Sequence, residues 1–258
     1  MTTASDMKGR YALITGGSSG IGAAMADQLA GRGANVVLVA RHAEQLEEVA
    51  ADLRERHGVA VLSVALGLDE PGAARRLVET VADAGIDVEL LINNAGMSSR
   101  ALVADSDPAV LRRLVDLNVG AVTELTTLLV AGMVRRGHGS VINIASTGAY
   151  TPAPHLAAYA ASKAYVLSFT QALWAETRAS GVRVVAVSPG PTRTSMNSRP
   201  GRGKRQPAQV ARTALAALER TGPGVVDGTR NKVTAFLVRS MPPRFMATLA
   251  LHAMAGGR

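Results

Sequence analysis

Tyr159 and Lys163 lie four positions apart in the sequence Tyr-Ala-Ala-Ser-Lys, and Ser146 precedes them along the chain. Residues four apart on a helix share a face, so the ammonium group of Lys163 is expected beside the phenol of Tyr159. A phenol has a pKa of about 10 in water, and a neighbouring cation favours its ionised form. The three side chains therefore predict a site that exchanges a proton with the oxygen of a carbonyl or an alcohol. The alternative is a half-buried tyrosine and a solvated lysine with no shared role, and other motifs must decide between the two.

A glycine-rich turn near the N-terminus provides the next motif. Residues 11–15 read as a buried strand, and the sequence Gly-Gly-Ser-Ser-Gly-Ile-Gly at residues 16–22 leads into an apolar helical stretch. Glycines let the main chain approach a pyrophosphate closely, and the free N–H groups at the start of a helix attract its charge. Because no Gly-Lys-Ser/Thr follows, a phosphate loop that cleaves ATP is disfavoured. The segment predicts a dinucleotide site, with a turn that binds no ligand as the alternative.

Apolar runs alternate with amphipathic stretches along most of the chain. The runs at 35–40, 60–65, 88–92, 140–144 and 182–187 read as buried parallel strands, and helices are expected at 44–56, 72–84, 108–136 and 156–180. This alternation predicts an α/β fold in which a doubly wound parallel sheet carries helices on both faces. At 258 residues and 47% apolar residues, the chain fits one domain over residues 1–258. The ligand crevice of such a sheet lies beyond the carboxyl ends of its strands.

Several motifs then occur in one order and carry a resemblance to a known family. They are Thr15-Gly16-x-x-x-Gly20-Ile21-Gly22, Asn93-Asn94-Ala95-Gly96, Asn118, Ser146, Tyr159-x-x-x-Lys163 and Pro189-Gly190. From about residue 8 to residue 194 the chain resembles the short-chain dehydrogenase/reductase family, in its compact single-domain branch. The resemblance implies a Rossmann-like fold and an oxidoreductase that interconverts a carbonyl and a secondary alcohol by hydride transfer to or from a nicotinamide cofactor.

The resemblance also assigns roles to four side chains. Ser146 would hydrogen-bond the reacting oxygen, and Tyr159 would give or take its proton as general acid and base. Lys163 would orient the nicotinamide ribose and lower the pKa of the tyrosine. Asn118 would hold a water that links the lysine to bulk solvent. Its alternative is an ordinary solvent-facing asparagine on a helix.

Cofactor contacts are likewise implied at the turns that follow the strands. The expected contact residues are Gly16, Ser18, Ser19, Gly20, Ile21, Arg41, Leu68, Asn94, Ala95, Gly96, Tyr159, Lys163, Pro189, Gly190, Thr192 and Thr194. Thr192 would meet the carboxamide through its backbone, and Thr194 would reach toward the phosphates.

Arg41 bears on the choice of cofactor. It directly follows the second apolar run, where an acidic residue would hold a ribose 2′-hydroxyl. A guanidinium there suits a 2′-phosphate instead, so NADP(H) is favoured over NAD(H). An ordinary solvated arginine is the alternative. One departure concerns the adenine, because family members usually carry Asp where this chain has Gly67, so either packing holds the ring or Asp69 replaces the missing acceptor.

The segments after Thr194 are expected to decide the substrate. Residues 195–220 are expected to form a lid, and the basic loop at 198–207 either steers a carrier-linked anionic substrate or is simply solvated. Met97, Tyr150 and Met196 suggest a hydrophobic carbonyl compound. The C-terminal extension, residues 231–258, is expected to be an interfacial membrane helix, or two short helices packed on the substrate pocket or on a partner subunit. A homodimer or homotetramer is implied by the resemblance.

Composition narrows the remaining classes. The net charge of +8 raises a basic nucleic-acid-binding protein as an alternative, but the charge is dispersed and aromatic residues make up only 3% of the chain. A catalytically silent NADP-binding regulatory protein is a third class. The sequence has no cysteine, no histidine spacing typical of a metal site and no uninterrupted apolar run long enough for a transmembrane helix. A cytoplasmic protein without a metal is expected.

Overall fold

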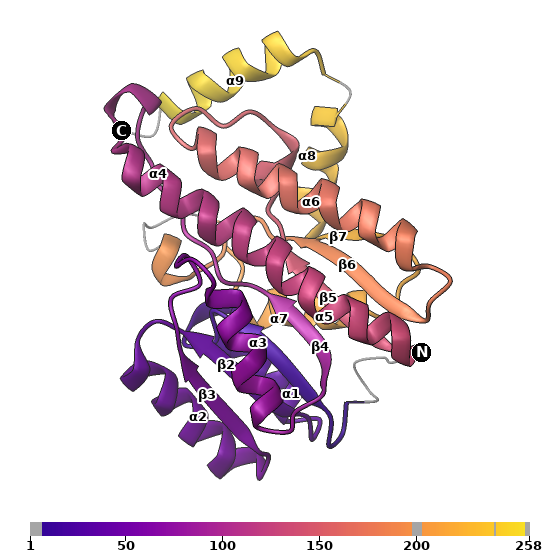
Figure 1. Cartoon of the computed structure of the whole chain (residues 1–258). Helices are drawn as coiled ribbons and strands as arrows, with labels where there is room; N and C mark the ends of the chain where they lie inside the picture. The colour runs from indigo at the N-terminus through magenta and orange to yellow at the C-terminus, as the bar shows by residue number, and fades with distance from the viewer. Residues whose placement is uncertain (1–6, 198–202, 240, 256–258) are drawn as a thin grey trace.

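A computed structural model describes residues 7–197, 203–239 and 241–255. Within them, seven parallel strands form one sheet between two layers of helices (Figure 1). The strands are β1 (Tyr11–Thr15), β2 (Asn35–Ala40), β3 (Val61–Ala65), β4 (Val88–Asn93), β5 (Gly139–Ile144), β6 (Val182–Ser188) and β7 (Gly224–Val226). The expected doubly wound α/β fold is confirmed. The three-residue strand β7 was not expected, since so short a run gives no clear periodicity.

The helices are α1 (Gly20–Ala30), α2 (Ala43–His57), α3 (Ala73–Asp83), α4 (Pro108–Val115), α5 (Val122–Arg136), α6 (Ala157–Thr177), α7 (Pro207–Ala217), α8 (Thr229–Arg239) and α9 (Pro243–Ala255), with short 3₁₀ turns η1 (Val103–Asp105), η3 (Thr147–Tyr150) and η4 (Ser195–Asn197). Apolar side chains of α1, α2 and α7 pack on one face of the sheet. Those of α3, α5 and α6 pack on the other face. Consecutive side chains of a strand point to opposite faces of the sheet, so Ile14 of β1 packs in the first layer and Leu13 in the second.

The order of the strands fixes where a ligand can enter. Across the sheet the order is β3-β2-β1-β4-β5-β6-β7, so the chain runs outward on one side of β1 and then returns to begin again at β4. In a doubly wound sheet the crevice opens beyond the carboxyl ends of the strands at such a switch point. The residues that follow β1 and β4 are therefore placed to line a ligand site.

The single long helix expected at residues 108–136 is interrupted. A π-helical turn, η2 (Asp116–Ala121), separates α4 from α5. Such turns widen a helix locally and often occur at functional sites. By length and composition alone, Pro108–Arg136 would suffice to cross a membrane, but the core helix of a globular domain passes the same test.

Part of the expected lid belongs to the core instead. α7 lies within residues 195–220, and its side chains Val210, Ala214 and Leu215 are fully buried. A lid could therefore include residues only up to the start of α7 at Pro207, and residues 198–202 lie outside the described part of the chain. The C-terminal extension forms α8 and α9, and Phe236 and Phe245 on them are well exposed, at 73% and 57%.

Candidate active site

The glycine turn after β1 has backbone angles and close contacts that residues with a side chain would not tolerate. Gly16 and Gly20 adopt positive φ angles of 67° and 57°. A Cβ on Gly22 would collide with the carbonyl oxygen of Gly16 and lie 2.6 Å from the side-chain nitrogen of Asn94. A Cβ on Gly20 would lie 3.1 Å from a methyl carbon of Thr194, which places that threonine against the turn. The turn is therefore tightly packed, and its bare main chain could approach a phosphate closely.

Thr15 and Asn94 tie the carboxyl ends of β1 and β4 together. The hydroxyl of Thr15 accepts hydrogen bonds from the backbone N–H groups of Asn94 and Ala95, at 3.0 and 2.9 Å. The side chain of Asn94 donates to the carbonyl oxygens of Thr15 and Gly16, at 2.9 and 3.2 Å. These bonds hold the glycine turn at the switch point. Thr15 was not among the expected site residues, although its place at the end of a strand before the turn was a usable signal.

Ser146 and Tyr159 meet at the carboxyl end of β5. Ser146 precedes the turn η3 and accepts a hydrogen bond from the N–H of Gly148 at 3.1 Å. Tyr159 lies in the first turn of α6, and a hydrogen bond joins its phenol to Ser146. Burial raises the pKa of Tyr159 above its ordinary value of 10.0, and the bond to Ser146 acts in the opposite direction.

Lys163 lies on α6 and is buried, with 5% of its surface exposed. Its ammonium donates a hydrogen bond to the carbonyl oxygen of Ile144 at 2.8 Å. Burial lowers the pKa of Lys163 from 10.5 to about 8, because the charged form loses its hydration. Burial of the phenol is the largest influence on the pKa of Tyr159 and raises it, and the opposing influence comes from Ser146. That Lys163 lowers this pKa stays a prediction.

Asn118 lies in the π-helical turn and is fully buried. Its side-chain oxygen accepts from the N–H of Met97 at 2.9 Å, and its nitrogen donates to the Met97 carbonyl at 2.9 Å and to Ser162 at 3.0 Å. A Cβ on Gly96 would lie 3.1 Å from the Asn118 oxygen and 3.5 Å from the Lys163 nitrogen. Asn118 therefore joins the loop after β4 to α6, and its alternative as a solvent-facing residue is wrong.

The second and third strands end at the expected adenosine side of the crevice. Arg41 directly follows β2 and is exposed. Leu68 is buried in the loop after β3. A Cβ on Gly67 would lie 3.0 Å from a carboxylate oxygen of Glu70 and 3.3 Å from one of Asp69. Two carboxylates thus lie beside the position where family members usually carry an aspartate.

The loop after β6 completes the crevice. The carbonyl of Pro189 accepts from the N–H of Thr147 at 2.9 Å, which ties this loop to the turn that follows Ser146. The hydroxyl of Thr192 donates to the carbonyl of Gly190 at 2.9 Å. Of the other expected contacts, Ser18, Ser19 and Ile21 lie in the glycine turn or at the start of α1.

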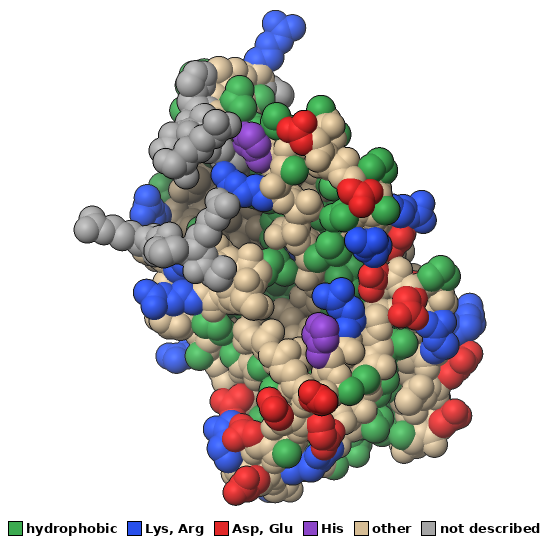
Figure 2. Space-filling view, turned by 90° about the vertical axis from the view of Figure 1, so that its left-hand side faces the viewer, with side chains coloured by type: hydrophobic (Ala, Val, Ile, Leu, Met, Phe, Trp, Pro, Cys, Tyr) green, Lys and Arg blue, Asp and Glu red, His purple; other side chains and the backbone are tan. Residues whose placement is uncertain are grey.

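Expected residues thus follow each of the strands β1 to β6, at one edge of the sheet, and the remaining ones, Asn118, Tyr159 and Lys163, come from η2 and α6. Figure 2 views the molecule from the side toward which the strands point, and that face is hollowed near its centre, with Lys, Arg and His side chains beside the hollow. Across the described ranges, no group of three or more His, Asp or Glu side chains could hold a metal ion.

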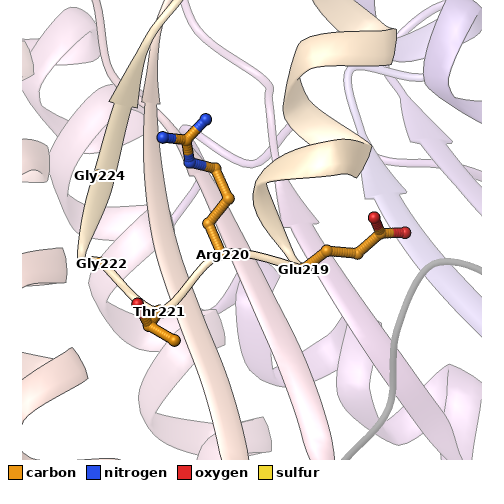
Figure 3. Close-up of a pocket in the computed structure, with 5 residues that line it drawn as sticks. All are labelled: Glu219, Arg220, Thr221, Gly222 and Gly224. Carbon is orange, nitrogen blue, oxygen red and sulfur yellow. The ribbon is translucent and has the colours of Figure 1, made fainter.

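Two surface pockets are lined by residues other than the expected catalytic and cofactor contacts. One is lined by Glu219, Arg220, Thr221, Gly222 and Gly224, between the end of α7 and the start of β7. Figure 3 shows the side chains of Glu219 and Arg220 pointing away from one another, so they form no joint binding group. The other is mostly apolar and is lined by η3, residues 151–154 and the first turns of α6.

Comparison with known proteins agrees with this geometry. A fold and site of this kind define a dinucleotide-dependent oxidoreductase, and the sequence model of the short chain dehydrogenase family matches residues 10–204. The chain therefore belongs to the short-chain dehydrogenase/reductase family. It is 33% identical over 186 residues to a very-long-chain 3-oxoacyl-CoA reductase of Macaca fascicularis, covering 70% of this chain and 59% of that enzyme's length.

Two solved structures are also similar. A short-chain dehydrogenase from Sphingobium yanoikuyae in complex with NADPH has a TM-score of 0.80 and 30% identity, covering 90% of this chain and 96% of that one. A 7β-hydroxysteroid dehydrogenase has a TM-score of 0.88 over 96% of this chain and 99% of that one, and at 24% identity the likeness concerns the fold.

Proposed function

We propose that this protein is an NADP(H)-dependent carbonyl reductase or alcohol dehydrogenase in which Tyr159 is the general acid and base. The observation that carries the proposal is the arrangement of Tyr159, hydrogen-bonded to Ser146 and on the same helix as the buried Lys163, at the edge of the sheet that also holds the glycine turn. A proton donor, a second hydroxyl and a dinucleotide cradle are the parts that carbonyl reduction requires.

The residues of the glycine turn fit a dinucleotide. Added side chains would crowd Gly16, Gly20 and Gly22, so only a bare backbone forms this cradle. The N-cap residue Ser19 makes no side-chain hydrogen bond to the first turn of α1, and that turn has no acidic residue. Its N–H groups and the positive end of the helix dipole therefore suit a pyrophosphate. When bound, the nicotinamide supplies or accepts the hydride.

The protein's own groups handle the proton and the developing charge. In reduction, the phenol of Tyr159 donates its proton to the substrate oxygen while the hydroxyl of Ser146 donates a hydrogen bond to the same atom. Burial raises the pKa of Tyr159 above 10.0, so the phenol carries at neutral pH the proton that reduction requires. Asn118 and Lys163 both lie beside Gly96, where an added Cβ would be 3.1 Å from the Asn118 oxygen and 3.5 Å from the Lys163 nitrogen.

Arg41 supports NADP(H) as the cofactor. It is exposed at the end of β2, where a guanidinium can form paired hydrogen bonds with a 2′-phosphate. The similar Sphingobium yanoikuyae enzyme is described in complex with NADPH.

The substrate is proposed to be a hydrophobic carbonyl compound, with a carrier-linked 3-oxoacyl thioester as one candidate. The similar enzyme of Macaca fascicularis is a 3-oxoacyl-CoA reductase. Met196 of the turn η4 is half exposed, and Met97 follows β4. Two cations of the basic loop are already engaged, since Lys204 donates to Asn197 at 2.9 Å and Arg205 pairs with Asp227. Anion steering by these two residues is therefore weakened.

The test is to follow NADPH absorbance with aldehydes, ketones, diketones and 3-oxoacyl thioesters, using Tyr159→Phe as the matched variant. Carbonyl-dependent oxidation of NADPH that Tyr159→Phe removes would support the proposal. Binding of NADPH without turnover of any carbonyl would instead indicate a silent regulatory protein. Salt-sensitive binding of DNA in place of NADPH would indicate the basic nucleic-acid-binding class.

A further inference from the structure

The loop Pro189–Thr194 is bonded to a segment that is remote along the chain. The N–H of Arg205 donates to the carbonyl of Pro191, and the N–H of Arg193 donates to the carbonyl of Arg205, both at 3.0 Å. Thr192 and Arg205 thus form an isolated parallel bridge. The backbone of Arg205 therefore pairs with the loop that follows β6 through a single parallel bridge.

The side chain of Arg205 is held by a buried carboxylate. Its Nε lies 2.6 Å from Oδ2 of Asp227, which directly follows β7 and is fully buried. The alignment is that of an ion pair and not of a straight hydrogen bond. The other oxygen of Asp227 accepts a hydrogen bond from Thr213 of α7 at 2.6 Å. A buried carboxylate is costly without a cation, so Asp227 holds the Arg205 side chain in one place.

Asp227 also contacts the start of the same loop, directly and through Asn231. Its N–H donates to the carbonyl of Ser188 at 3.0 Å, and its carbonyl accepts from the side chain of Asn231 at 2.7 Å. The side chain of Asn231 lies directly against Gly190, where a Cβ would be 2.6 Å from its amide carbon. Asn231 and Arg205, both bound to Asp227, therefore contact the loop at Gly190 and at residues 191–193.

We propose that Arg205 and Asp227 are positioning residues that hold the loop Pro189–Thr194 where it receives the nicotinamide end of the cofactor. The inference rests on the proposed function, because only an enzyme that uses a nicotinamide cofactor would bind one against this loop. Neither residue is assigned a contact with the reacting atoms. The pair acts through the backbone of residues 191–193 and through Asn231.

The test compares the loss of an arginine–carboxylate ion pair at two places, one beside the loop and one at the far end of the strands. Arg205→Gln and Asp227→Asn break the proposed contact. Arg10→Gln is the matched control, because Arg10 pairs with the buried Glu89 at 3.2 Å, near the opposite end of the strands. NADPH dissociation constants are measured by fluorescence titration, and stability is measured by urea unfolding of the same samples.

We expect Arg205→Gln and Asp227→Asn to raise the dissociation constant for NADPH about ten-fold, a factor worth about 1.4 kcal/mol. Arg205→Lys should restore part of the affinity, because it keeps the cation. Arg10→Gln should lower stability and leave NADPH affinity unchanged. Should the first two variants fail to fold, Thr213→Val is the milder probe, and it should weaken NADPH binding in the same direction.

Two results would overturn the proposal while leaving the proposed function intact. Equal NADPH affinity in Arg205→Gln and Arg10→Gln would show that the pair only stabilises the fold. Weaker binding in Arg205→Gln with unchanged binding in Asp227→Asn would show that Arg205 contacts the cofactor directly. Wild-type protein that binds neither NADPH nor NADH would overturn the proposed function and this inference with it.

Discussion

The ammonium group of Lys163 donates its hydrogen bond to the carbonyl of Ile144, the last residue of β5, at 2.8 Å. That carbonyl is a neutral acceptor, so it does not fully replace the water that the charged group loses on burial. For this reason the pKa of Lys163 falls to about 8. The lysine that the sequence marks for chemistry is therefore also a source of instability in the protein without cofactor.

Lys163 should make stability depend on pH. Between the folded pKa of about 8 and the unfolded value of 10.5, the unfolded chain binds more protons, so the free energy of unfolding from this group rises with pH across that window. Lys163→Met should remove a rise of about 3 kcal/mol, while the exposed Lys8→Met should leave it unchanged. Urea unfolding at a series of pH values measures the difference. A wild-type rise that persists in Lys163→Met would contradict the burial argument.

Tyr159 should ionise late in the protein without cofactor. Burial raises the pKa of Tyr159 above 10.0. The phenolate absorbance that the wild type shows and Tyr159→Phe lacks should therefore appear only above pH 10.0. Ser146→Ala should raise the pKa further, since the hydrogen bond to Ser146 lowers it. Spectrophotometric titration of the three proteins makes the comparison. A Tyr159 phenol that titrates below 10.0 would show that the cation of Lys163 dominates after all.

Gly22 should not tolerate a methyl group. A Cβ there would collide with the carbonyl oxygen of Gly16, so Gly22→Ala should lower stability by about 1–3 kcal/mol and weaken NADPH binding. Gly120→Ala is the matched control, because a Cβ there would meet nothing within 4 Å. It should be neutral or raise stability by up to about 1 kcal/mol. Urea unfolding and NADPH titration test both, and equal behaviour of the two variants would rule out the cradle.

Arg41 should set the preference between cofactors. Arg41→Asp removes a cation and adds a charge that repels a 2′-phosphate, so the ratio of kcat/KM with NADPH to that with NADH should fall roughly ten- to hundred-fold. Arg32 is exposed and lies two residues after α1, so Arg32→Asp makes the same change of charge away from the end of β2. Steady-state rates with the two cofactors give the ratio. An unchanged ratio in Arg41→Asp would refute the assignment.

Secondary structure and motifs that depend on residues close together in the sequence could be predicted from the sequence. The strand, turn and helix from Tyr11 to Ala30 are visible in apolar periodicity and glycine spacing, because both signals act between near neighbours. The same holds for Tyr159 and Lys163, whose spacing on one helix follows from their positions alone. Family motifs along the first three quarters of the chain then indicated that these pieces share one site.

Other features depend on contacts between residues far apart, and no local pattern contains them. The burial of Lys163 and Tyr159, which decides the direction of both pKa shifts, depends on what packs around α6. The π-helical turn at Asn118 is matched to bonds with Met97 and Ser162 on other segments. Amphipathic periodicity could not show that α7 packs on a face of the sheet instead of forming part of a lid. The charge of Arg205 could not show that it pairs with a buried carboxylate. The burial of a side chain and its pairing with a distant residue are set only by the tertiary structure. These two properties control the electrostatics of the site.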